Sequence, residues 1–133
     1  MTSSTSRSDK TVFPYESLSW FESAEFAGTR YRLARISVAR RIDLARRLRE
    51  IGKRIEFLEA GSDEREKLEA IALSAEIDRT YLEWGLEDVQ GLEIDGEVAT
   101  PTSLVERGPL ALAVEIIARI KSECGLTEAE RKN

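Results

Sequence analysis

The sequence predicts an α+β fold that is mainly α. It consists of an antiparallel helical hairpin, a third long helix, short N-terminal strands and a β-hairpin around Asp95-Gly96. Three observations predict it. Apolar residues recur every three or four positions in three long segments. They alternate with polar residues in a short run before the first of these segments. Only Ala60-Gly61-Ser62 separates the first two helical segments, so these helices must pack antiparallel.

The length of 133 residues suits one domain with a single core. We expect residues 1–10, rich in Ser and Thr, to be a disordered tail, residues 11–126 to form a single α+β domain, and residues 127–133 to be a C-terminal tail. No apolar run reaches bilayer length, and the N-terminus lacks a secretion signal. We therefore expect a cytoplasmic protein without a membrane partner.

Aromatic residues crowd the start of the domain, at Phe13, Tyr15, Trp20, Phe21 and Phe26. Such density is typical of a core layer or of an exposed partner-binding arm. We favour the core because large aromatic side chains bury much area, and we keep Trp20 and Phe21 as candidate partner-binding residues. A strand over 20–26 is predicted to pair, through a turn at 27–29, with a strand over 30–36.

The first helix is predicted to begin after Ser37, whose hydroxyl can cap it, and to end at Gly61. Its apolar face, spaced by four, three, four and three residues, comprises Leu44, Leu48, Ile51, Ile55 and Leu58, and Ile42, Ala45 and Gly52 widen it. Gly52 inside a helix costs about 1 kcal/mol relative to alanine, which suggests a close helix crossing at that point.

Charge is concentrated on this helix and the strand before it. The segment from Arg30 to Arg54 contains ten basic and two acidic residues, which gives it a net charge of +8. Since the whole chain has a net charge of −5, the other residues together carry −13. The candidate partner-binding cations are Arg40, Arg41, Arg46, Arg47, Arg49, Lys53 and Arg54. Arg40 and Arg41 occupy the first turn, where the helix dipole disfavours cations. Two explanations stay open: an external acidic partner, or the acidic residues of the second helix at Glu64, Glu66, Glu69, Glu76, Asp78 and Glu83.

The second helix is predicted from an acidic first turn after Asp63 to a stop at Gly85. It carries two apolar stripes, which predict burial on two sides. One comprises Leu68, Ile71, Ala72, Ala75 and Leu82, and the other comprises Leu73, Ile77, Tyr81 and Trp84.

The C-terminal part begins with Asp95-Gly96 between short alternating runs, a strong signal for a two-residue hairpin turn. A short helical turn is expected over 104–107, and Pro109 is expected to start the third long helix. Its predicted core stripe comprises Leu110, Ala113, Val114, Ile117, Ile120 and Cys124, broadened by Leu112 and Ile116. So apolar a helix is either central or half of a dimer interface. Gly125 would end it, and a capping box follows at 127–130.

The sequence lacks the residues that most catalytic and metal-binding sites require. The sequence has no histidine, which removes the commonest general base and metal ligand. Cys124 is the sole cysteine and is expected to be a buried hydrophobe rather than a nucleophile. Acidic residues around Asp95 suit a solvated turn better than a calcium loop. We therefore expect a protein that is not an enzyme, with no cofactor, no metal and no catalytic residue.

The sequence resembles a family of small proteins encoded in the tail gene clusters of tailed bacteriophages and prophages, of the tail assembly chaperone type. The resembling segments cover most of the chain from Gly28 onward: 35–37 with 40–44, 56–61, 81–86, 91–97 with 99–101, and 125–127 with 130–133. The resemblance implies a non-catalytic protein that keeps the tape-measure protein soluble during tail morphogenesis. No residue of this chain can be assigned a function from the resemblance, because the family has no catalytic motif. A longer frameshifted form, which such families often have, would account for the capping box at the end.

Two other functions remain as alternatives. One is a structural phage connector or tail-completion subunit. The other is a nucleic-acid-binding regulator that uses the basic helix, against which the pI of about 5.0 argues. A homo-oligomer is compatible with each of them.

Overall fold

The computed structural model describes residues 11–59 and 63–124. Its helices and strands are, in order, β1 (Leu18–Glu22), β2 (Arg30–Ala34), α2 (Val38–Glu59), α3 (Glu64–Gly85), β3 (Leu86–Gln90), β4 (Glu93–Ile94), β5 (Glu97–Val98), α4 (Pro101–Arg107) and α5 (Leu110–Glu123). The prediction of a mainly helical α+β fold is confirmed. The predicted tails (1–10 and 127–133), the helix-ending Gly61 and Gly125, and the C-terminal capping box lie outside the described residues.

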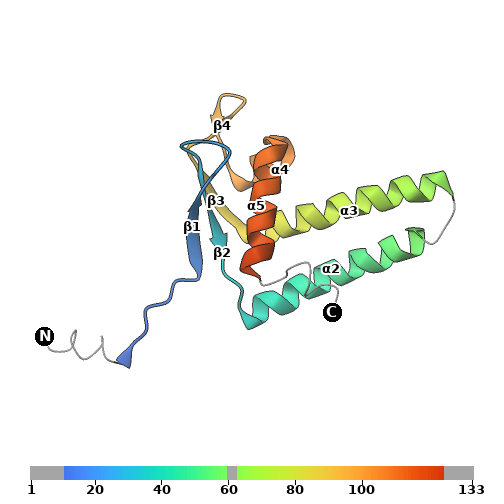
Figure 1. The fold of residues 1–133 in the computed structure, drawn as a ribbon, viewed down its shortest axis with the longest axis horizontal. Coiled ribbons are helices and arrows are strands. Elements are labelled where there is room, and N and C mark those ends of the chain that lie inside the picture. The colour runs from blue at the N-terminus through green and yellow to red at the C-terminus, as the bar shows by residue number, and fades with distance from the viewer. Residues whose placement is uncertain (1–10, 60–62, 125–133) are drawn as a thin grey trace, which may run out of the picture.

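An antiparallel sheet in the order β1-β2-β3 forms one side of the molecule (Figure 1). The central strand β2 is the predicted one, and its alternation decides which face is covered: Tyr31 and Leu33 are buried, while Arg30 and Arg32 lie half-exposed on the other face. The covered face packs on α5, whose side chains Leu112 and Ile116 are fully buried. The core therefore lies between the sheet, α5 and the C-terminal end of α3.

The first strand lies earlier than predicted, at 18–22 instead of 20–26. The chain leaves the sheet at Ser23 because this residue satisfies loop backbone groups. Its hydroxyl accepts a hydrogen bond from the Phe26 amide at 2.9 Å, and its amide donates to the Thr29 carbonyl, also at 2.9 Å. Residues 23–29 are therefore a loop, closed by a short turn between Phe26 and Thr29.

The N-terminal aromatic residues do not all join the core. Phe21 and Phe26 pack against it, and Trp20 is half-buried on the sheet. Phe13 and Tyr15, however, are 82% and 61% exposed. The expectation of a single aromatic core layer is wrong for these two residues, because they precede the sheet and no helix among the described residues covers them.

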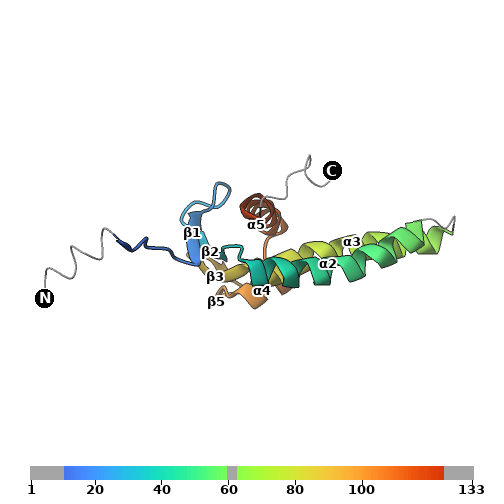
Figure 2. The same cartoon turned by 90° about the horizontal axis from the view of Figure 1, so that it is seen from below.

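Helices α2 and α3 form the predicted antiparallel hairpin, which projects from the body as a two-helix arm (Figures 1 and 2). The main row of the predicted α2 face is confirmed: Leu44 is buried, and Leu48, Ile51, Ile55 and Leu58 are half-buried against α3. The prediction that Ile42 and Ala45 widen this face is wrong, since both are exposed. Gly52 makes no close crossing, since a Cβ atom at this position would meet nothing within 4 Å. That expectation is wrong because Gly52 lies at the margin of the seam between the helices.

The two apolar stripes predicted on α3 differ in how far they are buried. The stripe of Leu73, Ile77, Tyr81 and Trp84 packs inward as predicted. The other is buried only at Leu82, whereas Leu68 and Ile71 are 62% and 65% exposed, and Ala72 and Ala75 are exposed as well. Burial on two sides is wrong for this part of α3, because α4 and α5 reach only its C-terminal end (Figure 1).

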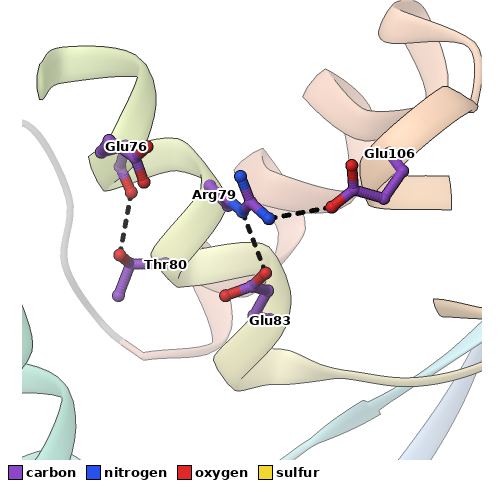
Figure 3. A network of polar contacts seen from close by, with 5 residues as sticks. All are labelled: Glu76, Arg79, Thr80, Glu83 and Glu106. Carbon is purple, nitrogen blue, oxygen red and sulfur yellow. Dashed lines mark hydrogen bonds and ion pairs between the residues drawn. The ribbon is translucent and has the colours of Figure 1, made fainter. Parts of the chain in front are cut away.

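The β4–β5 turn is confirmed, since Asp95 and Gly96 have φ values of 53° and 82°, as a type I′ turn requires. Helix α4 begins at Pro101, earlier than the turn expected at 104–107, because Thr100 and Ser103 form a reciprocal capping box. Arg79 on α3 binds Glu83 of its own helix at 3.0 Å and Glu106 of α4 at 2.9 Å (Figure 3). This ion-pair network joins α4 to α3.

Helix α5 is long and apolar as predicted, but it is rotated about its axis from the predicted orientation. Ile117, Ile120 and Cys124 are buried, whereas Leu110 and Val114 are 78% and 56% exposed. The prediction fails at these two residues because α5 has apolar side chains on more than one face, so periodicity alone cannot decide which face is covered.

Candidate protein-binding face of the helical hairpin

The structure distributes the sequence-predicted binding residues over three places. Trp20 and Phe21 lie on β1, Arg40 and Arg41 lie where α2 meets the body, and Arg46, Arg47, Arg49, Lys53 and Arg54 lie along the arm. We describe each place from its contacts, because a side chain already engaged within the chain is less free to bind a partner.

Arg40 is bound inside the fold. Its guanidinium lies 4.3 Å from the centroid of the Trp84 ring and donates a hydrogen bond to the Trp84 carbonyl. That carbonyl is among the last four of α3, which lack helical partners and carry the negative end of the helix dipole. The antiparallel hairpin thus places a cation of the first turn of α2 against the last turn of α3. This contact explains an arginine that is unfavourable within its own helix.

Arg41 lies near the C-terminal end of α5. Burial raises the pKa of the Cys124 thiol, and the positive charges of Arg40 and Arg41 partly offset that rise. Cys124 is 5% exposed, so its predicted burial is confirmed. Arg41 also lines an open hollow of about 490 Å³ together with Ser37 and Ile42.

The two aromatic candidates are engaged by cations of the same chain. The Trp20 ring lies under the guanidinium groups of Arg30 and Arg32, at 4.2 and 5.2 Å from its centroid. Phe21 lies under the Arg119 guanidinium at 4.6 Å. These contacts stabilise the sheet and its packing on α5.

Three of the remaining cations, Arg46, Arg49 and Lys53, lie on the face of α2 that points away from α3, whereas Arg47 and Arg54 lie nearer the seam. Ile42, Arg46, Arg49, Lys53 and Phe57 follow one another by four, three, four and four residues. The first four each lie two residues before a residue of the buried row, and Phe57 lies two residues after Ile55, so all five lie about 160 to 200° around the helix from that row. We call these five residues the outer face of α2. Ile42 is 47% exposed and Phe57 is 75% exposed, so two apolar side chains flank three cations.

The cations of the outer face make no ion pair with a described residue. Of the α2 cations, Arg47 alone makes an ion pair with a described residue, to Asp43 at 3.0 Å. Pairing with the acidic residues of α3 is therefore wrong for the described residues. The apolar residues of α2 and α3 pack against each other between the two helices, so the charged residues of both helices point away from this contact. Beside this face, a hollow of about 320 Å³ is lined by Lys53, Arg54, Phe57, Leu58 and Glu69.

Sequence reasoning missed two functional features. It assigned Ile42 to the buried face and did not single out Phe57, although the offset of two residues from the Leu44 row would have placed both on the opposite face. It also missed Glu115, a carboxylate in the middle of the apolar α5. Glu115 accepts hydrogen bonds from Ser23 Oγ at 2.9 Å and from Tyr31 Oη at 2.9 Å, and so ties the β1–β2 loop to α5.

Within residues 11–59 and 63–124, no group of three or more Cys, Asp or Glu side chains has a metal-binding arrangement. No helix of this region is long and apolar enough to cross a membrane. No protein-family model, curated protein or solved structure matches the chain. The candidate site therefore rests on its own geometry: an exposed helical face in which two apolar side chains flank three cations.

Proposed function

We propose that the protein is a non-catalytic assembly chaperone of the phage or prophage tail type, which binds a helical tail protein, such as the tape-measure protein, in the cytoplasm of the bacterial host. The observation that carries the proposal is the outer face of α2, where the exposed Ile42 and Phe57 flank three cations, Arg46, Arg49 and Lys53, that make no ion pair with a described residue. The sequence resemblance supports the same function.

The chemistry of this face defines its partner. An amphipathic helix can lay its apolar side chains on Ile42 and Phe57 while its carboxylates meet the three cations, a helix-against-helix mode of recognition. Burying the exposed Phe57 ring contributes about 2 kcal/mol. Each exposed ion pair adds about 0 to 1 kcal/mol. Such affinity is modest, as a chaperone that must release its client requires.

The test is co-expression with the long helical protein encoded in the same tail cluster, followed by affinity capture. Phe57→Ser and Arg49→Glu should each reduce recovery of the client about tenfold or more, because the first removes the most exposed apolar side chain of the face and the second reverses the charge at its centre. Arg47→Glu is the matched control. It makes the same charge change two residues away, at an arginine that lies off the face and is paired with Asp43. Equal recovery for all four proteins would refute the proposal.

Two results would favour the alternative functions instead. Saturable binding to random DNA at low salt, weakening steeply as salt rises, would indicate a nucleic-acid-binding regulator. Detection of the protein in purified virions would indicate a connector or tail-completion subunit, since a chaperone leaves the finished particle.

A further inference from the structure

The face of α3 that points away from α2 is an apolar surface that no described residue covers. Leu68, Ile71, Ala72 and Ala75 are all exposed, and their spacing of three, one and three residues places them on one side of the helix. The row continues inward to Leu82, which is buried beneath α4. The uncovered stretch therefore ends where α4 begins, and it belongs to the part of α3 that projects from the body (Figure 1).

By side-chain size, this row of four residues fits an antiparallel copy of itself. Two copies of α3 can lie antiparallel about a two-fold axis that passes between Ile71 and Ala72. Leu68 then faces Ala75 of the second copy, and Ile71 faces Ala72 of the second copy. Each large side chain meets a small one, as interdigitated helix packing requires.

The charges bordering the row form more opposite-sign than like-sign pairs in the same register. Glu64 and Arg79 extend the row at its two ends by four residues each, so the register places them opposite one another. Lys67 and Asp78 share one flank, and Arg65 and Glu76 share the other. In an antiparallel pair related by this axis, equivalent flanks of the two copies adjoin. Lys67 then lies beside Asp78 of the second copy, two residues of rise (about 3 Å) from exact alignment, and Arg65 lies at the same offset from Glu76 of the second copy.

These charged residues are available for such contacts. All six are exposed on the surface of α3: Glu64, Arg65, Lys67, Glu76, Asp78 and Arg79. Of these, Arg79 alone is bound to other described side chains, Glu83 and Glu106, through ion pairs that are themselves exposed (Figure 3). The two-fold axis repeats every contact. Among the six residues the register gives three kinds of opposite-charge pair (Glu64–Arg79, Lys67–Asp78 and Arg65–Glu76) and two kinds of like-charge neighbour (Glu64–Asp78 and Arg65–Arg79), so attractions outnumber repulsions.

From these observations we infer that the outer side of α3 is a self-association surface, on which a second copy of this chain docks antiparallel to form an isologous dimer. Because α2 and α3 bear their exposed faces on opposite sides of the arm, this inference is independent of client binding by α2.

Sedimentation equilibrium of the full chain over micromolar to submillimolar concentrations tests it. The expected species is a dimer, twice the chain mass of 15.0 kDa. Ile71→Asp should give a monomer. Lys67→Glu should weaken association about tenfold or more, because it replaces attraction by repulsion at two symmetric places. The double variant Lys67→Glu with Asp78→Lys should restore it, since the exchanged charges again oppose one another.

The restoration is specific to the antiparallel register and excludes simple loss of folding as the cause. A wild-type protein that stays monomeric at every concentration would overturn the inference. So would a dimer that is indifferent to Ile71→Asp, or a charge-reversed pair that fails to regain the association lost by Lys67→Glu. Affinity capture of the helical client, measured separately with Phe57→Ser, distinguishes failure of this inference from failure of the proposed function.

Discussion

Replacing Glu115 by Gln is expected to lower the free energy of unfolding by about 2 kcal/mol. The carboxylate accepts four hydrogen bonds: Oε1 from Ser23 Oγ at 2.9 Å and the Glu25 amide at 3.3 Å, and Oε2 from Tyr31 Oη at 2.9 Å and the Ala24 amide at 3.2 Å. Glutamine keeps only one acceptor oxygen, so the two hydrogen bonds accepted by the other carboxylate oxygen are lost. Hydrogen bonds to charged groups contribute about 1.5 to 3 kcal/mol each, and partial exposure reduces the sum for the pair to about 2 kcal/mol.

Thermal and urea unfolding followed by circular dichroism measure this change. For 133 residues the entropy of unfolding converts 1 kcal/mol into about 3 to 4 °C, so the melting temperature should fall by about 7 °C. Tyr31→Phe, which removes one donor, should cost about 1 kcal/mol, and the double variant should be less destabilised than the sum. Glu123→Gln, at an exposed carboxylate of the same helix, is the control and should change stability by under about 0.5 kcal/mol. A Glu115→Gln variant as stable as this control would refute the role of the carboxylate.

The same group predicts a pH dependence. Burial raises the pKa of Glu115, but its hydrogen bonds from Tyr31, Ser23 and the loop amides outweigh that effect and hold the pKa below its ordinary value of 4.5. Because the folded state favours the carboxylate, its stabilisation is complete well above pH 4.5 and is lost as pH falls through the lowered pKa. The stability difference between wild type and Glu115→Gln should therefore be constant near neutral pH and shrink below pH 4.5. A difference undiminished at pH 3 would contradict this assignment.

Two further substitutions test packing. Gly91→Ala should destabilise the fold by about 2 to 5 kcal/mol in urea unfolding, because φ is +79° and the new Cβ would lie 2.0 Å from a backbone oxygen of the β1–β2 loop. Gly96→Ala, with a similar φ of +82° but open space, should cost only about 1 kcal/mol, and equal losses would contradict the steric argument. Arg40→Met should cost about 1 to 2 kcal/mol through loss of its contacts with Trp84, whereas Arg41→Met should cost less; the reverse order would refute the capping of α3 by Arg40.

Local signals in the sequence were sufficient for the elements themselves. The alternation around Tyr31, the four-three spacing of the Leu44 row and Asp95-Gly96 each specify backbone geometry within a few residues. Such patterns depend on neighbours close in the chain, so no tertiary information is needed to interpret them. Element ends were less predictable. The first strand ends at Ser23 because of a loop hydrogen bond to Phe26 that the apolar pattern does not reveal.

The choice among apolar faces required the tertiary structure. Leu68 and Leu82 belong to the same stripe of α3, yet one is 62% exposed and the other 4%. Their difference follows from how far α4 and α5 extend along α3, which periodicity cannot specify. The charges were misjudged for a related reason. Opposite net charges on two helices suggest pairing, but an apolar seam between antiparallel helices directs both sets outward, and Arg49 finds no carboxylate within the described chain.

The two exposed faces of the arm have a joint consequence. If two copies pair through α3, their α2 outer faces lie on opposite sides of a four-helix layer, and one dimer presents two client-binding faces. A long client with several amphipathic helices could then engage both, and the second contact would gain from a high effective concentration. Lys67→Glu should consequently weaken capture of a full-length helical client, about tenfold or more, while leaving the affinity for a single client helix unchanged. Comparison of the two affinities by surface-immobilised binding measures this, and an equal loss for both would show that the α3 surface contacts the client itself.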